Sequence, residues 1–235
     1  MELLNVGSLF RITDVLLFHG RAYEHIVLVH YRETSEHFVR GLFKLSRSNI
    51  EKLKNFVCSR QKGSHNLHLS SFVVSLAYAW VCKVKVEETK SKKVGMAINV
   101  DCRKRLDPPV PQTYFENCIG ARIAFAKTRE FLDEDGGVVV AVESLSFSLE
   151  TLKDGVLNEA KTWSSFLHDG LHSDEEMKIT GAAGTPRFEV YGSDFGWGRP
   201  KKVDMVSIDR TGVIFLSDSR DGDGLDSNVI ALLIY

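Results

Sequence analysis

The chain has 235 residues, of which 43% are hydrophobic and 26% charged, a composition typical of one large globular domain or two small ones. Its net charge of -1 at pH 7 excludes a bulk attraction to nucleic acid or to an anionic membrane, so any anion site must be a local cluster. The four cysteines include no Cys-x-x-Cys pair, which argues against a zinc site and favours reduced thiols over a disulfide framework.

The N-terminal segment, residues 1–21, is apolar but interrupted by Arg11 and Asp14. The uninterrupted stretches are well short of the about 20 residues that a membrane span needs. No basic start or clear small-residue cleavage site marks a signal peptide, so the expected location is the cytoplasm.

Two strands and two helices are predicted next. Residues 24–31 and 37–45 have the apolar content of strands. Residues 46–60 predict a helix, in which Ser48 and Glu51 have capping-box spacing. Residues 69–86 predict a buried helix with Ser70 or Ser71 as N-cap and one apolar face, made of Phe72, Leu76, Ala79 and Trp80.

The second half of the chain mixes strands and helices without a regular βαβ rhythm. Strands are expected at residues 92–103 and 118–128, and a helix at 158–171. At residues 136–152 the valine run favours a strand, but the length and the later spacing favour a helix, which we expect. The tail, residues 201–235, holds three short apolar runs separated by turn residues, which indicates antiparallel pairing. The fold class that follows is α+β with a mixed or antiparallel sheet.

The best local anion candidate is the basic cluster Arg103, Lys104 and Arg105, which stands where a strand meets a proline-rich loop. An arginine fork matches a phosphate or a carboxylate. The alternative is an ordinary solvated strand end, with Asp101 and Asp107 as partners of the arginines.

A glycine-rich loop near the C-terminus reads "SDFGWGRP". Gly196 and Gly198 allow backbone conformations that other residues avoid, and we expect Trp197 to pack onto the domain. For Asp194 a strut that accepts backbone N–H groups is favoured over a catalyst. The other signatures of a protein kinase are missing, the histidine pairs lack metalloprotease order, and no serine stands in a nucleophile elbow.

The stretch "DFGWG", Asp194 to Gly198, resembles the signature of the plant BAHD acyl-CoA-dependent acyltransferases. The stretches "VRGLFKLSRSNIEKLKNFV", "LSSFVVSLAYAWVC" and "NVDCRKRLDPPVPQTYFENC" resemble that family in the same order. The last is closest to the branch that acylates anthocyanin and phenolic glucosides, often with malonyl groups. That branch carries Tyr-Phe-Gly-Asn-Cys, whereas Glu116 replaces the glycine here, where a bulky acid would disturb a tight backbone site.

The resemblance implies a chloramphenicol acetyltransferase-like domain, present here as a single C-terminal half. Residues 36–235 would form this domain, behind a leader or remnant of the N-terminal half at residues 1–35. Family members hold a tunnel between two such domains. The histidine of an His-x-x-x-Asp motif in the first domain is the base that deprotonates the acceptor hydroxyl. Here no histidine is followed by aspartate four residues on.

The function implied is malonyl or hydroxycinnamoyl transfer from acyl-CoA to a flavonoid or phenolic glucoside, with acyl-CoA as co-substrate and no permanently bound cofactor or metal. The alternative is a non-catalytic paralogue, or a module that binds acyl-CoA or a partner. The chain would act as a monomer or pair with a missing N-terminal half. The resemblance implies no catalytic residue in this chain, a structural role for the signature loop and a mainly structural role for Asp194. It also implies CoA-side contacts from Lys54, Ser71, Phe72, Arg103, Arg105 and Arg187.

Overall fold

A computed structural model describes residues 27–35, 38–61, 67–133, 136–158, 160, 177–203, 205, 212–220 and 228–234. The main helices are α2 (Arg47–Arg60), α3 (Ser71–Val86), α4 (Thr128–Phe131) and α5 (Gly137–Glu150). The strands are β1 (Val27–Ser35), β2 (Phe38–Leu45), β3 (Lys93–Asp101), β4 (Ile119–Lys127), β5 (Met177–Ala183), β6 (Ile214–Asp218) and β7 (Asn228–Ile234). The helix predicted at residues 158–171 lies almost wholly outside the described residues.

The strands form one mixed sheet in the order β1-β2-β7-β6-β5-β3-β4. Strand β5 runs parallel to both of its neighbours, β3 and β6, and every other pair is antiparallel. The tail pairs β6 with β7 in antiparallel fashion, which confirms the pairing that its turn residues indicate. The α+β class with a mixed, largely antiparallel sheet is therefore confirmed.

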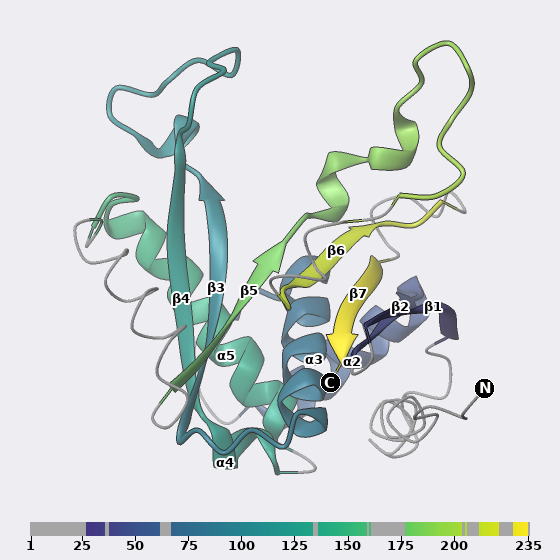
Figure 1. Cartoon of the computed structure of the whole chain (residues 1–235). Helices are drawn as coiled ribbons and strands as arrows, with labels where there is room; N and C mark the ends of the chain where they lie inside the picture. The colour runs from purple at the N-terminus through teal and green to yellow at the C-terminus, as the bar shows by residue number, and fades with distance from the viewer. Residues whose placement is uncertain are drawn as a thin grey trace.

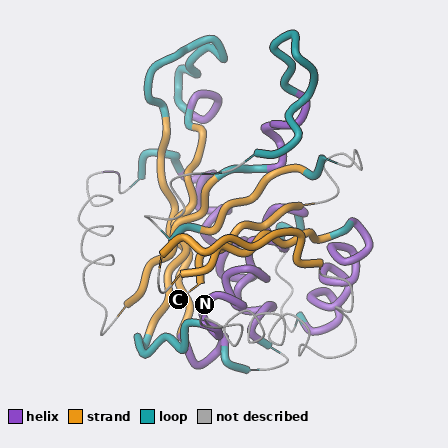
Figure 2. Tube along the Cα trace, turned by 45° about the vertical axis from the view of Figure 1, so that its right-hand side comes forward, coloured by secondary structure: helices purple, strands orange, loops and turns teal. Residues whose placement is uncertain are grey.

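The helices α2, α3 and α5 contact one another and pack on the same face of the sheet (Figure 2). On β3 and β4 the even-numbered residues are buried, and most odd-numbered residues are more exposed. Helix α3 lies in the middle of this layer and is buried on all sides from Val73 to Val84, more completely than its predicted single apolar face. No helix within the described ranges is long and apolar enough to cross a bilayer.

The helix starts follow local capping. Ser70 caps α3 by accepting a hydrogen bond from the Val73 N–H at 3.2 Å, one of the two caps that the sequence allows. For α2 the predicted cap is wrong. Ser46 accepts the Asn49 N–H at 3.2 Å, so the helix begins two residues earlier than the Ser48–Glu51 spacing indicates.

Two long connections rise from one end of the sheet (Figure 1). The first arm, residues 102–118, joins β3 to β4. The second arm, residues 184–203, follows β5 and contains the DFGWG loop. Figure 1 shows α3 and β3 running in opposite directions, so the start of α3 points toward the end of the domain that bears the arms.

Candidate functional site

The first arm is organised by Arg103. Its Nε and Nη2 atoms donate to both carboxylate oxygens of Asp101, at 3.0 and 2.7 Å, and its Nη1 donates to the Gln112 carbonyl oxygen at 2.8 Å. The Val110 N–H donates in turn to the Arg103 carbonyl oxygen at 2.8 Å. The guanidinium therefore ties the two sides of the arm together. Of the two interpretations of the basic cluster, this geometry favours the strand end with Asp101 as partner.

Arg105 and the aromatic part of the arm are also engaged locally. Arg105 donates from Nη1 to the Asp101 carbonyl oxygen at 3.1 Å. The Tyr114 hydroxyl donates to Glu116 at 2.9 Å, and this hydrogen bond raises the pKa of Tyr114. Glu116 is exposed and its φ is not in the left-handed region, so the disturbance expected from the missing glycine is not observed.

The ion pair in the first arm makes a prediction about pH. The hydrogen bonds from Arg103 lower the pKa of Asp101 from 3.8 to about 2. Because the folded pKa is depressed, the pair stabilises the arm above the unfolded value of 3.8, and this contribution is lost as the pH falls toward 2. We expect carbon-detected NMR titration to show Asp101 titrating near pH 2, and near its ordinary value in Arg103→Gln.

Arg105→Gln is the matched control for this titration. Arg105 bonds the main-chain oxygen of Asp101 rather than its carboxylate, and it is the weakest contributor to the Asp101 pKa. An Asp101 midpoint that moves as much in Arg105→Gln as in Arg103→Gln would contradict the assignment of the shift to the bidentate pair.

The DFGWG loop is held from within by Asp194. One carboxylate oxygen, Oδ1, accepts the N–H groups of Gly196 at 2.7 Å and of Gly198 at 3.0 Å. The two glycines have φ values of +94° and +91°, which confirms the conformational reason for placing glycine there. Charge-assisted bonds to the main chain are what a strut provides, so we expect Asp194 to shape the loop.

The packing predicted for Trp197 is wrong for this domain. Trp197 is 94% exposed and Phe195 is 84% exposed, and a Cβ added at either glycine of the loop would meet no atom within 4 Å. The second arm carries the loop beyond the edge of the sheet, where none of the other helices and strands that the structure describes reaches it (Figure 1). The side chain that was expected to anchor the loop instead presents its whole indole to the outside.

The base of the second arm is fixed by two residues that the sequence analysis did not single out. Asp218, buried at the end of β6, accepts the N–H groups of Val190 at 3.2 Å and Tyr191 at 3.5 Å. The Tyr191 hydroxyl accepts the Val203 N–H at 3.4 Å, which joins the outgoing and returning sides of the arm. An acidic residue that closely follows the apolar run "VIFL" is the signal that could have pointed to Asp218.

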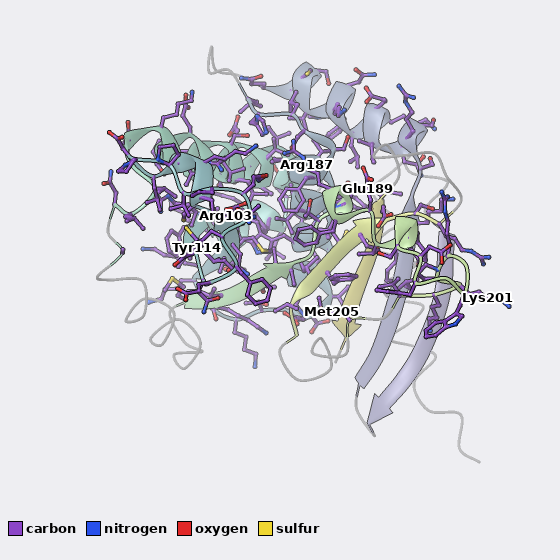
Figure 3. The ribbon with its side chains drawn as sticks, turned by 90° about the horizontal axis from the view of Figure 1, so that it is seen from above. Arg103, Tyr114, Arg187, Glu189, Lys201 and Met205 are labelled. Atoms are coloured by element: carbon purple, nitrogen blue, oxygen red, sulfur yellow. The ribbon has the colours of Figure 1, made fainter. Side chains whose placement is uncertain are left out.

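The remaining candidate residues are dispersed. Lys54 lies on α2, on the opposite side of the molecule from the first arm (Figure 1), and pairs with Glu51 at 2.7 Å. Phe72 packs against the main core, and Ser71 is half-buried in the first turn of α3. Arg187 is exposed on the second arm, and Figure 3 shows it apart from Arg103. The structure thus keeps Arg103 and Arg105 together on the first arm and Ser71 and Phe72 together at the start of α3, and it leaves Lys54 and Arg187 apart from both pairs.

We find no candidate metal site in the part of the chain that the structure describes. No three His, Cys, Asp or Glu side chains gather there in a way that could hold a metal ion.

Comparison with known proteins gives concordant matches. A model of the Transferase family matches residues 29–233. The chain is 36% identical over 192 residues to phenolic glucoside malonyltransferase 1 of Arabidopsis thaliana, covering 79% of this chain and 40% of that protein. It is 35% identical over 176 residues to malonyl-coenzyme:anthocyanin 5-O-glucoside-6'''-O-malonyltransferase of Salvia splendens, covering 73% of this chain and 35% of that protein. The chain therefore spans less than half the length of these relatives.

Solved structures share the fold. Vinorine synthase superposes with a TM-score of 0.62 at 22% identity, covering 88% of this chain and 45% of that one. F. sporotrichioides TRI101, complexed with Coenzyme A and T-2, gives a TM-score of 0.60 at 14% identity and covers 92% and 49% of the two chains. These likenesses confirm the chloramphenicol acetyltransferase-like fold. The family match over residues 29–233 shows that the chain belongs to the Transferase family of BAHD acyltransferases, and its relatives include anthocyanin and phenolic glucoside malonyltransferases.

Proposed function

We propose that this chain is the second half of an acyl-CoA-dependent O-acyltransferase of flavonoid or phenolic glucosides, and that it transfers malonyl or hydroxycinnamoyl groups only when a first half is paired with it. The observation that carries the proposal is the set of highly exposed aromatic side chains on the two arms, which includes Phe115, Phe195 and Trp197. Large aromatic groups this exposed are what a protein–protein interface buries.

The partner that would cover these exposed aromatic side chains is a first half of the kind that the longer relatives contain. Those relatives match this chain over only 35–42% of their own length, so more than half of each lies outside the matched part. Both arms rise from the same end of the sheet, so one partner can contact both (Figure 1). In family members the first half also supplies the histidine base, and general-base help is worth about 10²–10⁴-fold in rate.

We expect the purified chain alone to transfer no acyl group above background from malonyl-CoA or coumaroyl-CoA to a phenolic glucoside. Mixed with the separately expressed first half of Arabidopsis phenolic glucoside malonyltransferase 1, it should co-elute in gel filtration and gain turnover. The gain should vanish when the histidine of the His-x-x-x-Asp motif in that first half is replaced by alanine.

The double variant Phe115→Ser/Trp197→Ser separates docking from folding. Both side chains are almost fully exposed, so the variant should fold like the parent and yet fail to co-elute or to gain turnover. Its matched control is Phe147→Ser, since Phe147 is 72% exposed but belongs to α5 and to neither arm. Turnover by the chain alone that survives repurification would overturn the proposal.

The alternative is a module that binds acyl-CoA without turnover, which we retain because no histidine of the printed chain stands in an His-x-x-x-Asp motif. Calorimetric heat with malonyl-CoA, together with no turnover in the mixture, would favour it. Under either function we propose a cytoplasmic location.

A further inference from the structure

Two cysteines face each other at the base of the first arm. The register of β3 against β4 pairs Asp101 with Ile119 as its last pair. The next pair outward is Cys102 with Cys118, joined by a hydrogen bond of 2.9 Å from the Cys102 N–H to the Cys118 carbonyl oxygen. Residues directly opposite in a hydrogen-bonded antiparallel position have Cα atoms about 5.5 Å apart, which is within the range that a disulfide spans, about 4.4–6.8 Å.

The two side chains also share one face of the sheet. Successive side chains of a strand alternate between faces, and the even-numbered residues of β3 and β4 face the helices. Cys102 and Cys118 continue this even-numbered series. They pack into the same small apolar cluster with Val100 and Val156. Backbone spacing and the shared face therefore bring the two thiols within the reach of a disulfide. The Cys102 thiol donates to the Val100 carbonyl oxygen at 3.5 Å, a weak bond that it gives up when it reacts.

We propose that Cys102 and Cys118 form a reversible disulfide that clamps the base of the first arm. With hydrogen peroxide as oxidant, the Cys118 sulfur first attacks one peroxide oxygen. The O–O bond breaks, a sulfenic acid forms and one water leaves. The Cys102 sulfur then attacks the Cys118 sulfur, the S–S bond forms, the S–O bond breaks, and the Cys102 proton leaves in the second water. Two thiols and one peroxide give one disulfide and two waters, and a dithiol reductant restores the thiols.

The surroundings set the order of these steps. Cys118 is half-buried, whereas Cys102 is 2% exposed. Burial, and next the neighbouring Cys118 sulfur, raise the pKa of the Cys102 thiol, so Cys118 meets the oxidant first. The other two cysteines lie elsewhere: Cys58 is exposed on α2, and Cys82 is buried in α3, where burial raises its pKa to about 12.

The bridge would act on the arm that carries Arg103 and Phe115. It closes residues 103–117 into a loop, which restricts the unfolded chain and holds the arm's two ends together. Closing a loop of this size should raise the melting temperature of the oxidised chain by about 5 °C or more. This effect is independent of acyl transfer, so it stands or falls separately from the proposed function.

The test treats the full chain with a few equivalents of hydrogen peroxide, blocks remaining thiols with N-ethylmaleimide and maps the tryptic peptides without reductant. We expect peptide 94–103 joined to peptide 106–122, released by dithiothreitol. Cys58→Ser should keep this linked pair and Cys118→Ser should abolish it together with the rise in melting temperature. Cys102→Ser should behave like Cys118→Ser, but Cys102 is buried, so Cys118→Ser carries the test if that variant folds poorly.

The proposal is overturned if the oxidised, folded protein yields Cys102 as a free thiol after denaturation. It is equally overturned if Cys118 ends as a sulfinic acid or is joined to Cys58 instead of Cys102.

Discussion

Gly184→Ala is expected to lower the free energy of unfolding by about 2–5 kcal/mol, the combined cost of a left-handed backbone for a non-glycine residue and of overpacking. Gly184 follows β5 directly and has a φ of +71°. A Cβ at this position would overlap the Leu216 carbonyl oxygen and the Phe215 ring on β6. Neither obstacle can move cheaply, because Phe215 and Leu216 are both buried within the sheet.

Urea unfolding followed by circular dichroism measures this loss, and Gly192→Ala is its control. Gly192 also belongs to the second arm, but an added Cβ there meets only the Glu189 Cβ, at 3.9 Å, an ordinary contact. We expect Gly192→Ala to stay within about 0.5 kcal/mol of the parent. If Gly184→Ala lowered the free energy of unfolding no more than Gly192→Ala does, the close approach of residue 184 to β6 would not constrain this fold.

Trp80→Ala should lower the free energy of unfolding by about 3–5 kcal/mol, the usual range when a buried tryptophan is truncated to alanine. Trp80 lies in α3 with no exposed surface, and its ring meets Phe131 edge to face at a centroid distance of 4.6 Å. Its indole N–H has no hydrogen-bond partner among the described residues, so its contribution comes from packing. Chemical denaturation of the variant measures the loss.

Trp197→Ala is the matched tryptophan variant. Since Trp197 is 94% exposed, its removal should change the free energy of unfolding of the isolated chain by no more than about 0.5 kcal/mol. A loss near that of Trp80→Ala would show that the signature loop packs onto this domain after all, and would restore the role that the sequence alone suggests for it.

Several elements were predictable because their signal is local. The helices α2, α3 and α5 each repeat apolar residues at helical spacing, and this period persists whatever the helix packs against. The serine caps belong to the same class, since a side-chain oxygen three residues before an N–H needs no distant partner. The choice between Ser46 and Ser48 was missed because both offer that oxygen, and only the path of the chain out of β2 selects Ser46.

Strand β5 was not predicted, and its sequence explains why. The stretch "MKITGAA" has only Ile179 and Thr180 as β-branched residues, and glycine and alanine are depleted in strands. It is a strand because β3 and β6 offer it hydrogen-bonding partners on both sides. Those partners come from distant parts of the chain, so the residues around β5 alone do not predict that it is a strand.

What the sequence determined by itself is the family, the main helices, the glycine conformations of the signature loop and the role of Asp194 as an acceptor of main-chain N–H groups. The helices, the glycine conformations and the Asp194 contacts depend on residues that are neighbours along the chain, and the family is marked by several such short stretches in a fixed order. Only the tertiary structure decided that Arg103 also reaches across its arm to Gln112, that Asp218 fixes the second arm, and that Trp197 is exposed. The physical reason is that the exposure and the pairing of a side chain depend on which distant segments fold back over it, and the arms extend past every described element that could do so.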